Sequence, residues 1–209
     1  MTKKNKLDSD NSLCEGALCI LNEAETLFAQ KGFPAVSMNE IAQQAKVSKA
    51  NIFHHFKSKE SLYLAVLKQA CNRSSVALEL VNKQSAENKV EQMKFFFSNH
   101  LQTLLSQSSS TRLIQRELME NSEHRGKQLA EEVFADSFAK VIHLVREAQS
   151  HGFIRESIEP ALLAFLLIGT NVIFFETQAM LKHLPDVHFT ESPSRYNSAV
   201  FDILVNGFK

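Results

Sequence analysis

The sequence predicts an all-α protein in which a small N-terminal helix-turn-helix domain is joined by a linking helix to a larger helical domain. Only six Gly and four Pro occur among 209 residues. Leu, Ala, Glu, Lys and Gln recur at helical spacing, and no sustained apolar-polar alternation indicates a strand. Two short patterned segments separated by a tight turn, within residues 37–56, must cross at a steep angle. The predicted parts are a tail (1–11), the helix-turn-helix domain with its linking helix (12–80) and a second domain (81–209).

Serine residues mark the starts of the first four predicted helices. A Ser hydroxyl can accept a hydrogen bond from an amide two or three residues later, and a Glu at the third position completes a capping box. Ser12 with Glu15 and Ser37 with Glu40 fit this box. The four candidate caps are Ser12, Ser37, Ser48 and Ser58. They predict helices at about 12–32, 38–45, 49–56 and 59–80.

Longer helices follow the polar stretch 81–89, where we place the domain boundary. Apolar spacing predicts helices at about 90–105, 111–119, 126–150, 159–184 and 193–207. The most apolar stretch, residues 161–175, is too short and too interrupted to span a bilayer, which needs about 20 apolar residues. It is predicted to be a buried helix.

The distribution of charge is more informative than its sum. The chain has 23 basic and 23 acidic residues and a formal net charge of zero. The stretch from Lys46 to Lys59, however, contains four lysines and no acid. Any affinity for nucleic acid must therefore come from this local positive charge.

The outward side chains of the third helix suit the reading of DNA bases. The second helix of a helix-turn-helix enters the major groove, and we expect Ile52, Phe53 and Phe56 to face inward. The residues left outside are small or able to form hydrogen bonds. Asn can pair with adenine, and Ala can contact a thymine methyl. The predicted base-reading residues are Lys49, Ala50, Asn51 and His54.

A second set of residues suits contact with the phosphate backbone. Hydroxyls, imidazoles and ammonium groups all donate to phosphate oxygens. The predicted phosphate contacts are Ser37, Ser48, His54, His55, Lys57 and Lys59. The alternative is a solvated helical hairpin whose lysines have no partner.

Residues 20–67, ILNEAETLFAQKGFPAVSMNEIAQQAKVSKANIFHHFKSKESLYLAVL, resemble the N-terminal DNA-binding domain of the tetracycline-repressor (TetR) family. The resemblance lies in LFAQKGF, the EIA after Ser37, AxxAxVS and the aromatic-HF-x-SKE-x-L signature. There are two departures. Lys46 stands where the family often has Gly, at a cost of order 1 kcal/mol if the backbone is left-handed. Phe53 stands where many members have Tyr, whose hydroxyl reaches a phosphate.

The resemblance implies a ligand-responsive transcriptional regulator, usually a repressor, that binds a palindromic operator as a homodimer. It also implies that the second domain binds a small effector and dimerises through its last two long helices. Because Phe is abundant in that domain, we expect an apolar or aromatic effector. The candidate pocket residues are Phe96, His100, Leu104, Arg116, Glu120, Phe134, Phe138, Thr170 and Phe174. The candidate interface residues are Leu162, Phe165, Phe175, Phe201 and Leu204.

Other classes of function find little support in the sequence. No GxSxG, HExxH, P-loop, GxGxxG or CxxC motif occurs, so we expect no enzyme, no cofactor and no metal. Three cysteines without metal-ligand spacing and a polar N-terminus fit a cytoplasmic protein without membrane attachment. The remaining alternative is a helical module that binds another protein without sequence-specific DNA binding.

Overall fold

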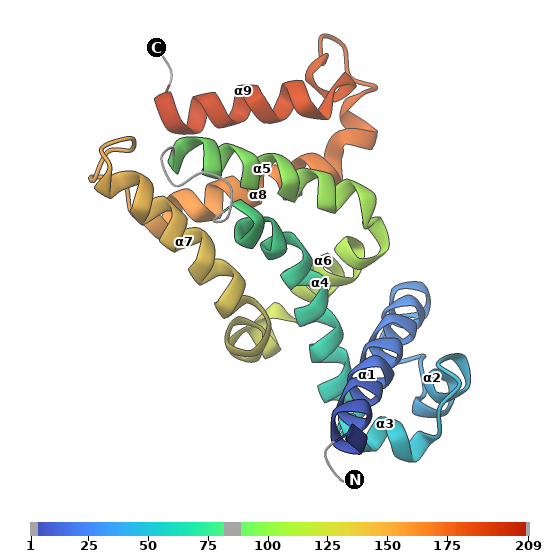
Figure 1. The fold of residues 1–209 in the computed structure, drawn as a ribbon. Helices are drawn as coiled ribbons and strands as arrows, with labels where there is room; N and C mark the ends of the chain where they lie inside the picture. Colours follow the sequence, from blue (N-terminus) through green and yellow to red (C-terminus); the bar gives the residue numbers. More distant parts are fainter. Residues whose placement is uncertain (1–3, 82–88, 208–209) are drawn as a thin grey trace. The chain divides into compact units, whose positions relative to one another are not determined.

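The computed structural model describes residues 4–81 and 89–207, and the described residues form helices without a strand (Figure 1). The all-α prediction is confirmed. The chain divides into two compact units. The first unit contains residues 1–70 and 109–133, and the second contains residues 71–108 and 134–209. The predicted domain boundary at 81–89 falls mainly on residues 82–88, which lie outside the described residues.

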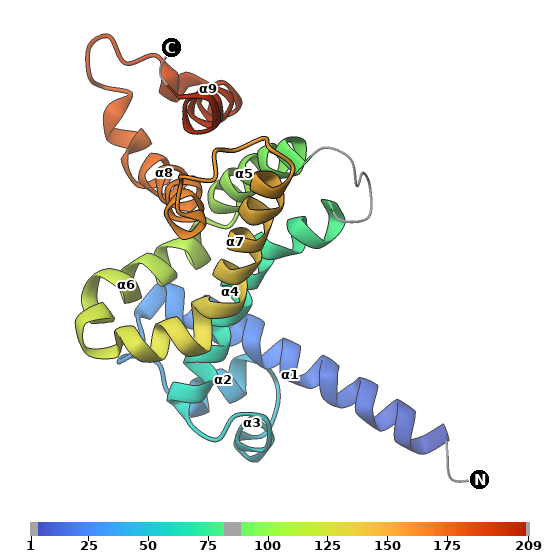
Figure 2. The ribbon, with the colours of Figure 1, turned by 90° about the vertical axis from the view of Figure 1, so that its left-hand side faces the viewer.

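The first unit is built on α1 (Lys4–Lys31), α2 (Met38–Gln44) and α3 (Lys49–His55). Figure 2 shows α1 as one long helix whose C-terminal half lies beside α2 and α3. Ile20, Phe28, Ile41 and Ile52 are fully buried. Ile41 belongs to α2 and Ile52 to α3, so each short helix buries an apolar side chain. The unit also includes the first part of α4 (Lys59–Val81) and most of α6 (Ser108–Leu129).

The second unit is a bundle of α5 (Lys89–Ser106), α7 (Ala135–Ser150), α8 (Pro160–Leu181) and α9 (Pro193–Asn206). A short 3-10 helix, η2 (Phe189–Glu191), precedes α9. Figure 1 shows α5 beside both α8 and α9. The core of the second unit combines the rings of Phe97 and Phe201 with aliphatic side chains such as Val145 and Leu167. Burial of this apolar surface is the main stabilising contribution.

Two helix boundaries differ from the prediction. α1 begins at Lys4 rather than at Ser12, because the residues before Ser12 include no Pro or Gly that would stop a helix. The helices predicted at 111–119 and 126–150 are joined. α6 continues through Gly126 and passes through a π-helical turn, η1 (Ala130–Phe134), into α7. A Gly inside a helix costs only about 1 kcal/mol, and good helix formers surround this one.

α8 is less buried than its composition predicts. It is the one helix among the described residues that is long and apolar enough to cross a membrane, but only 33% of its most apolar window is buried. Core helices of soluble proteins meet the same criterion. One face of α8 packs against α5 and α7. The opposite face carries the exposed side chains Leu162, Phe165, Leu166, Ile173 and Met180. The single core can cover only one side of a helix that is apolar nearly all round.

Candidate nucleic-acid interface

The turn between α2 and α3 is a Schellman motif that places Lys46 in a left-handed conformation. The amide of Val47 donates to the carbonyl of Ala42 (3.0 Å), and the amide of Lys46 donates to Gln43 (3.2 Å). Lys46 has φ 55°. This pattern satisfies the last carbonyls of α2 and reverses the chain within a few residues. The Lys that replaces the Gly of the family therefore occupies the position where Gly is preferred.

Serine caps start α2, α3 and α4 as predicted. Ser37 Oγ accepts from the amide of Glu40 (3.1 Å), and Ser48 Oγ accepts from Asn51 (3.1 Å). Ser58 Oγ accepts from the amide of Ser61 (3.0 Å). Ser37 and Ser48 are exposed. Since each hydroxyl uses its oxygen to accept, its O–H can still donate to a phosphate.

The exposed face of α3 is wider than the sequence indicated. Lys49, Ala50 and His54 are exposed as predicted, and Ile52 is fully buried. Phe53, which was expected to face inward, is 43% exposed. Neighbouring positions on a helix point about 100° apart, so Ile52 and Phe53 cannot share one buried face. Phe53 therefore joins the outward residues of α3.

Asn51 and His55 are only half exposed. The Asn51 Oδ1 and His55 Nε2 atoms are buried and have no hydrogen-bond partner within the described residues. The His55 ring lies beside His54 and Phe56, with ring centroids 5.3 and 6.2 Å away respectively. A buried polar atom without a partner is costly. Adenine can satisfy the Asn51 amide only if the side chain rotates outward.

Lys59 is held at the first turn of α4 by two contacts with the loop after α1. Its Nζ lies 4.4 Å from the centre of the Phe33 ring and 3.4 Å from the carbonyl oxygen of Pro34. Lys57 is exposed two residues earlier. An ammonium group has three donors, so these contacts orient Lys59 and leave capacity for an anion.

Further residues support this end of α4, and no local pattern in the sequence indicates them. Tyr63 is buried, and its ring lies 5.0 Å from Phe28 and 4.8 Å from Phe33. Its hydroxyl donates to Glu117 Oε2 of α6 at 3.0 Å. Because 54 residues separate this pair, helical periodicity cannot reveal it.

The predicted pocket residues of the second unit lie mostly in its core. Phe96, His100, Leu104 and Phe174 are buried, while Phe134, Phe138 and Thr170 are half-buried. Asn171 Nδ2 donates to the Phe97 carbonyl (2.8 Å) and lies 3.3 Å from His100 Nδ1. Asn197 donates to the same carbonyl (3.2 Å). Desolvation by burial lowers the pKa of His100 to about 4. The imidazole is therefore a neutral member of an internal polar cluster.

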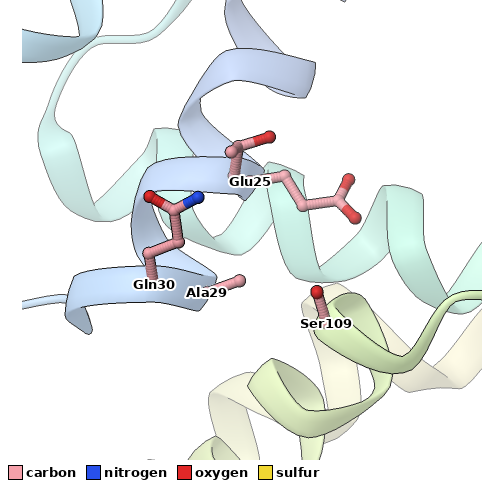
Figure 3. A pocket seen from close by; sticks show the side chains of 5 residues that line it. Glu25, Ala29, Gln30 and Ser109 are labelled. Carbon is pink, nitrogen blue, oxygen red and sulfur yellow. The ribbon is translucent and has the colours of Figure 1, made fainter.

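Arg116 and Glu120, the other two predicted pocket residues, are exposed on α6 in the first unit. The same unit contains a pocket of about 150 Å³, open to solvent, between α1 and α6 (Figure 3). Four of its five lining residues carry polar side chains: it is lined by Glu25, Thr26, Ala29, Gln30 and Ser109. Neither Arg116 nor Glu120 lines it.

The predicted interface residues divide into exposed and buried sets. Leu162 and Phe165 are exposed, at 50% and 61%, and Leu204 is half-buried. Phe175 and Phe201 are buried inside the second unit, which corrects their expected place at an interface. Phe175 lies on the face of α8 that packs into the core, and Leu162 and Phe165 lie on the other face.

The described side chains include no group of three or more His, Cys, Asp or Glu residues that could hold a metal ion.

Comparison with known proteins identifies the first unit. Residues 20–66 match the family model for bacterial regulatory proteins of the tetR family. The Tn10 TetC protein of Escherichia coli is 46% identical over 50 residues, which cover 24% of this chain and 25% of TetC. QacR of Staphylococcus aureus is 34% identical over 82 residues, which cover 39% of this chain and 42% of QacR. The chain thus matches less than half the length of these relatives.

Solved structures match nearly the whole fold. FadR of Bacillus halodurans has a TM-score of 0.74 at 18% identity, with 91% of this chain and 98% of FadR covered. FadR of Bacillus subtilis, solved with stearoyl-CoA, has a TM-score of 0.73 at 21% identity, with 92% and 99% covered. The fold, the helix-turn-helix with its serine caps, and the matched residues together lead to one assignment: residues 20–66 are similar to the conserved N-terminal region of bacterial regulatory proteins of the tetR family.

Proposed function

We propose that this protein is a ligand-responsive transcriptional regulator, a repressor, that binds a palindromic DNA operator as a homodimer. The observation that carries the proposal is the exposed face of α3. Lys49, Ala50, Phe53 and His54 are outward there, and Lys57 and Lys59 follow. α3 enters the major groove, where Lys49, Ala50 and Asn51 read base edges. The flanking hydroxyls and lysines contact phosphates and fix the register.

A homodimer is supported by the uncovered face of α8. Its exposed apolar residues include Leu162, Leu166, Ile173 and Met180, which are four or seven residues apart and line one stripe. A second copy of α8 would cover this stripe in an isologous interface. The two-fold axis of such a dimer matches the symmetry of a palindromic site, whose half-sites lie about 34 Å or a multiple apart.

The proposed effector is small and apolar. The core of the second unit is made of aliphatic and phenylalanine side chains. The Bacillus subtilis FadR that shares this fold was solved with stearoyl-CoA, which supports an effector with a long apolar part. Phe134 and Phe138 are half-buried, and we keep them as the aromatic contacts of the proposed effector. Residues 12–80 would carry DNA binding and residues 81–209 effector binding and dimerisation, in a cytoplasmic protein.

Salt dependence of DNA binding tests the proposal. Each neutralised phosphate contributes about −0.9 to the slope of log Kobs against log salt concentration. Lys59→Ala should weaken binding to operator and random duplexes about equally and reduce the slope by about one. Lys182→Ala, which removes an exposed lysine from the second unit, is the matched control. A wild-type protein without salt-dependent affinity would instead favour the protein-binding module.

A further inference from the structure

The first unit contains a chain of ionic contacts between α6 and the start of α4. Glu117 of α6 is only 4% exposed. Its Oε2 accepts from the Tyr63 hydroxyl at 3.0 Å, and its Oε1 lies 3.0 Å from Nη1 of Arg125. Nη2 of Arg125 lies 3.4 Å from Oε1 of Glu60. Arg125 therefore bridges a buried carboxylate and an exposed one.

A helix-turn-helix does not require this arrangement for its own core. α1, α2 and α3 already pack through apolar side chains. A buried carboxylate costs several kcal/mol to desolvate and is tolerated only when its partners are well placed. Apolar residues of the same volume would often be as stabilising. We therefore infer that Glu117 and Arg125 have a role besides stability.

One arm of the ionic chain leads through Tyr63 to the ring that Lys59 contacts, and the other leads to Glu60, the residue after Lys59 in the sequence. Glu60 is the next residue after Lys59 on α4. Tyr63 lies 4.8 Å from the Phe33 ring, and the same ring lies 4.4 Å from the Lys59 ammonium group. One arm therefore fixes the surface on which Lys59 rests. The other holds the carboxylate that is closest to Lys59 in sequence.

The charge of Glu60 matters for a phosphate at this position. The Glu60 side chain is exposed, and an unpaired carboxylate there would repel a phosphate that approaches Lys59. The Arg125 guanidinium offsets that charge, and Glu117 orients the guanidinium from the buried side.

We propose that Arg125 and Glu117 are positioning residues for phosphate recognition by Lys59. They neutralise Glu60 and fix Tyr63 and Phe33 beneath the Lys59 side chain. The proposal rests on the proposed DNA-binding function and adds α6 residues, outside the helix-turn-helix, to the phosphate site.

Charge rescue tests the proposal on the full-length protein. Arg125→Gln should weaken binding to a random duplex about tenfold, because Glu60 becomes unpaired. Adding Glu60→Gln should restore the affinity to within about threefold of wild type. Lys127→Gln is the control, since Lys127 is exposed on the same helix and pairs only weakly, with Glu131 at 3.9 Å. It should change the affinity less than twofold.

Failure of the rescue would overturn the proposal, as would equal effects of Arg125→Gln and Lys127→Gln. If Arg125→Gln does not fold, Tyr63→Phe replaces it, because that variant keeps the ring and loses one hydrogen bond. It should weaken binding about threefold in the wild-type background and have no further effect beside Lys59→Ala. The same loss in both backgrounds would contradict the positioning role. Absence of DNA binding by the wild-type protein would instead refute the function itself.

Discussion

Lys46 shows how a single residue can reduce stability at a site that the fold needs. The Schellman turn places it at φ 55°, where a side chain with a Cβ costs about 1 kcal/mol more than Gly. Its positive charge lies within the acid-free segment that we propose faces DNA. We infer that stability is exchanged there for attraction to phosphate.

Lys46→Gly should therefore raise the free energy of unfolding by about 1 kcal/mol relative to Lys46→Ala. Both variants lose the charge, but only the Gly variant relieves the backbone. Urea unfolding followed by circular dichroism measures the difference. Equal stabilities of the two variants would show that the left-handed position is not strained.

Phe53 presents an aromatic ring on the side of α3 that we propose faces DNA, without the hydroxyl that many proteins of the tetR family have at this position. It is 43% exposed, so an added hydroxyl can reach solvent or a phosphate. Phe53→Tyr should tighten binding to operator and random duplexes alike by about 0.5 to 1.5 kcal/mol. Fluorescence anisotropy with labelled duplexes measures this.

The control is Phe95→Tyr on α5 of the second unit, where the ring is similarly exposed at 48%. It should leave both affinities unchanged. A gain restricted to the operator would indicate that residue 53 reads a base instead of a phosphate.

At the scale of elements, α5 and α8 meet through a polar cluster inside an apolar unit. His100 of α5 lies 3.3 Å from the Asn171 amide of α8, and its ring stacks on Phe96 with centroids 5.8 Å apart. These neighbours are neutral, and burial alone lowers the His100 pKa to about 4. The cluster is satisfied only while the imidazole is uncharged.

Acid should accordingly destabilise the bundle. The unfolded chain binds a proton at His100 near pH 6.5, whereas the folded chain does so near pH 4. Between these values the unfolded state holds more protons, so stability falls as the pH falls. The loss attributable to His100 is about 2 kcal/mol between pH 7.5 and pH 5. Urea unfolding at both values should show a smaller loss for His100→Gln than for wild type. An identical loss of stability in His100→Gln and wild type would show that the proton binds to another group.

The sequence predicts a helix well where the signal lies within a few neighbouring residues. The serine caps at 37, 48 and 58 locate three helix starts, because a cap and its amide are three residues apart. Apolar spacing gives the buried face of α2. The continuous path from α6 to α7 was missed, since a π-helical turn has no periodicity of its own.

For the candidate site, too, the sequence predicts the local features and not the contacts between distant residues. Segment 46–59 was found from its charge, and the exposure of Phe53 could have been found from the 100° spacing of side chains. The contacts of Lys59 with Phe33, and of Tyr63 with Glu117, join distant parts of the chain. Such contacts depend on the packing of helices, which no local pattern specifies.

At the scale of the whole molecule, dimerisation should depend on the exposed stripe of α8. Ile173 is 63% exposed near the middle of that stripe. Ile173→Glu would place a charge within a face proposed to be covered, at a cost of several kcal/mol. Sedimentation velocity should show a monomer, and affinity for a palindromic operator should fall because one half-site is lost.

The matched control is Met119→Glu, the same kind of change at an exposed apolar residue of α6 outside the stripe. It should remain a dimer with unchanged operator affinity. A dimeric Ile173→Glu protein would move the interface away from this face of α8.

We propose that two copies of α3 read a symmetric DNA site. Selection of bound duplexes from a random pool by the full-length protein, followed by sequencing, tests this most directly. We expect enrichment of an inverted repeat whose half-sites are centred about 10 base pairs, or a multiple of that, apart. Enrichment of a site without two-fold symmetry, or no enrichment above the starting pool, would contradict the account.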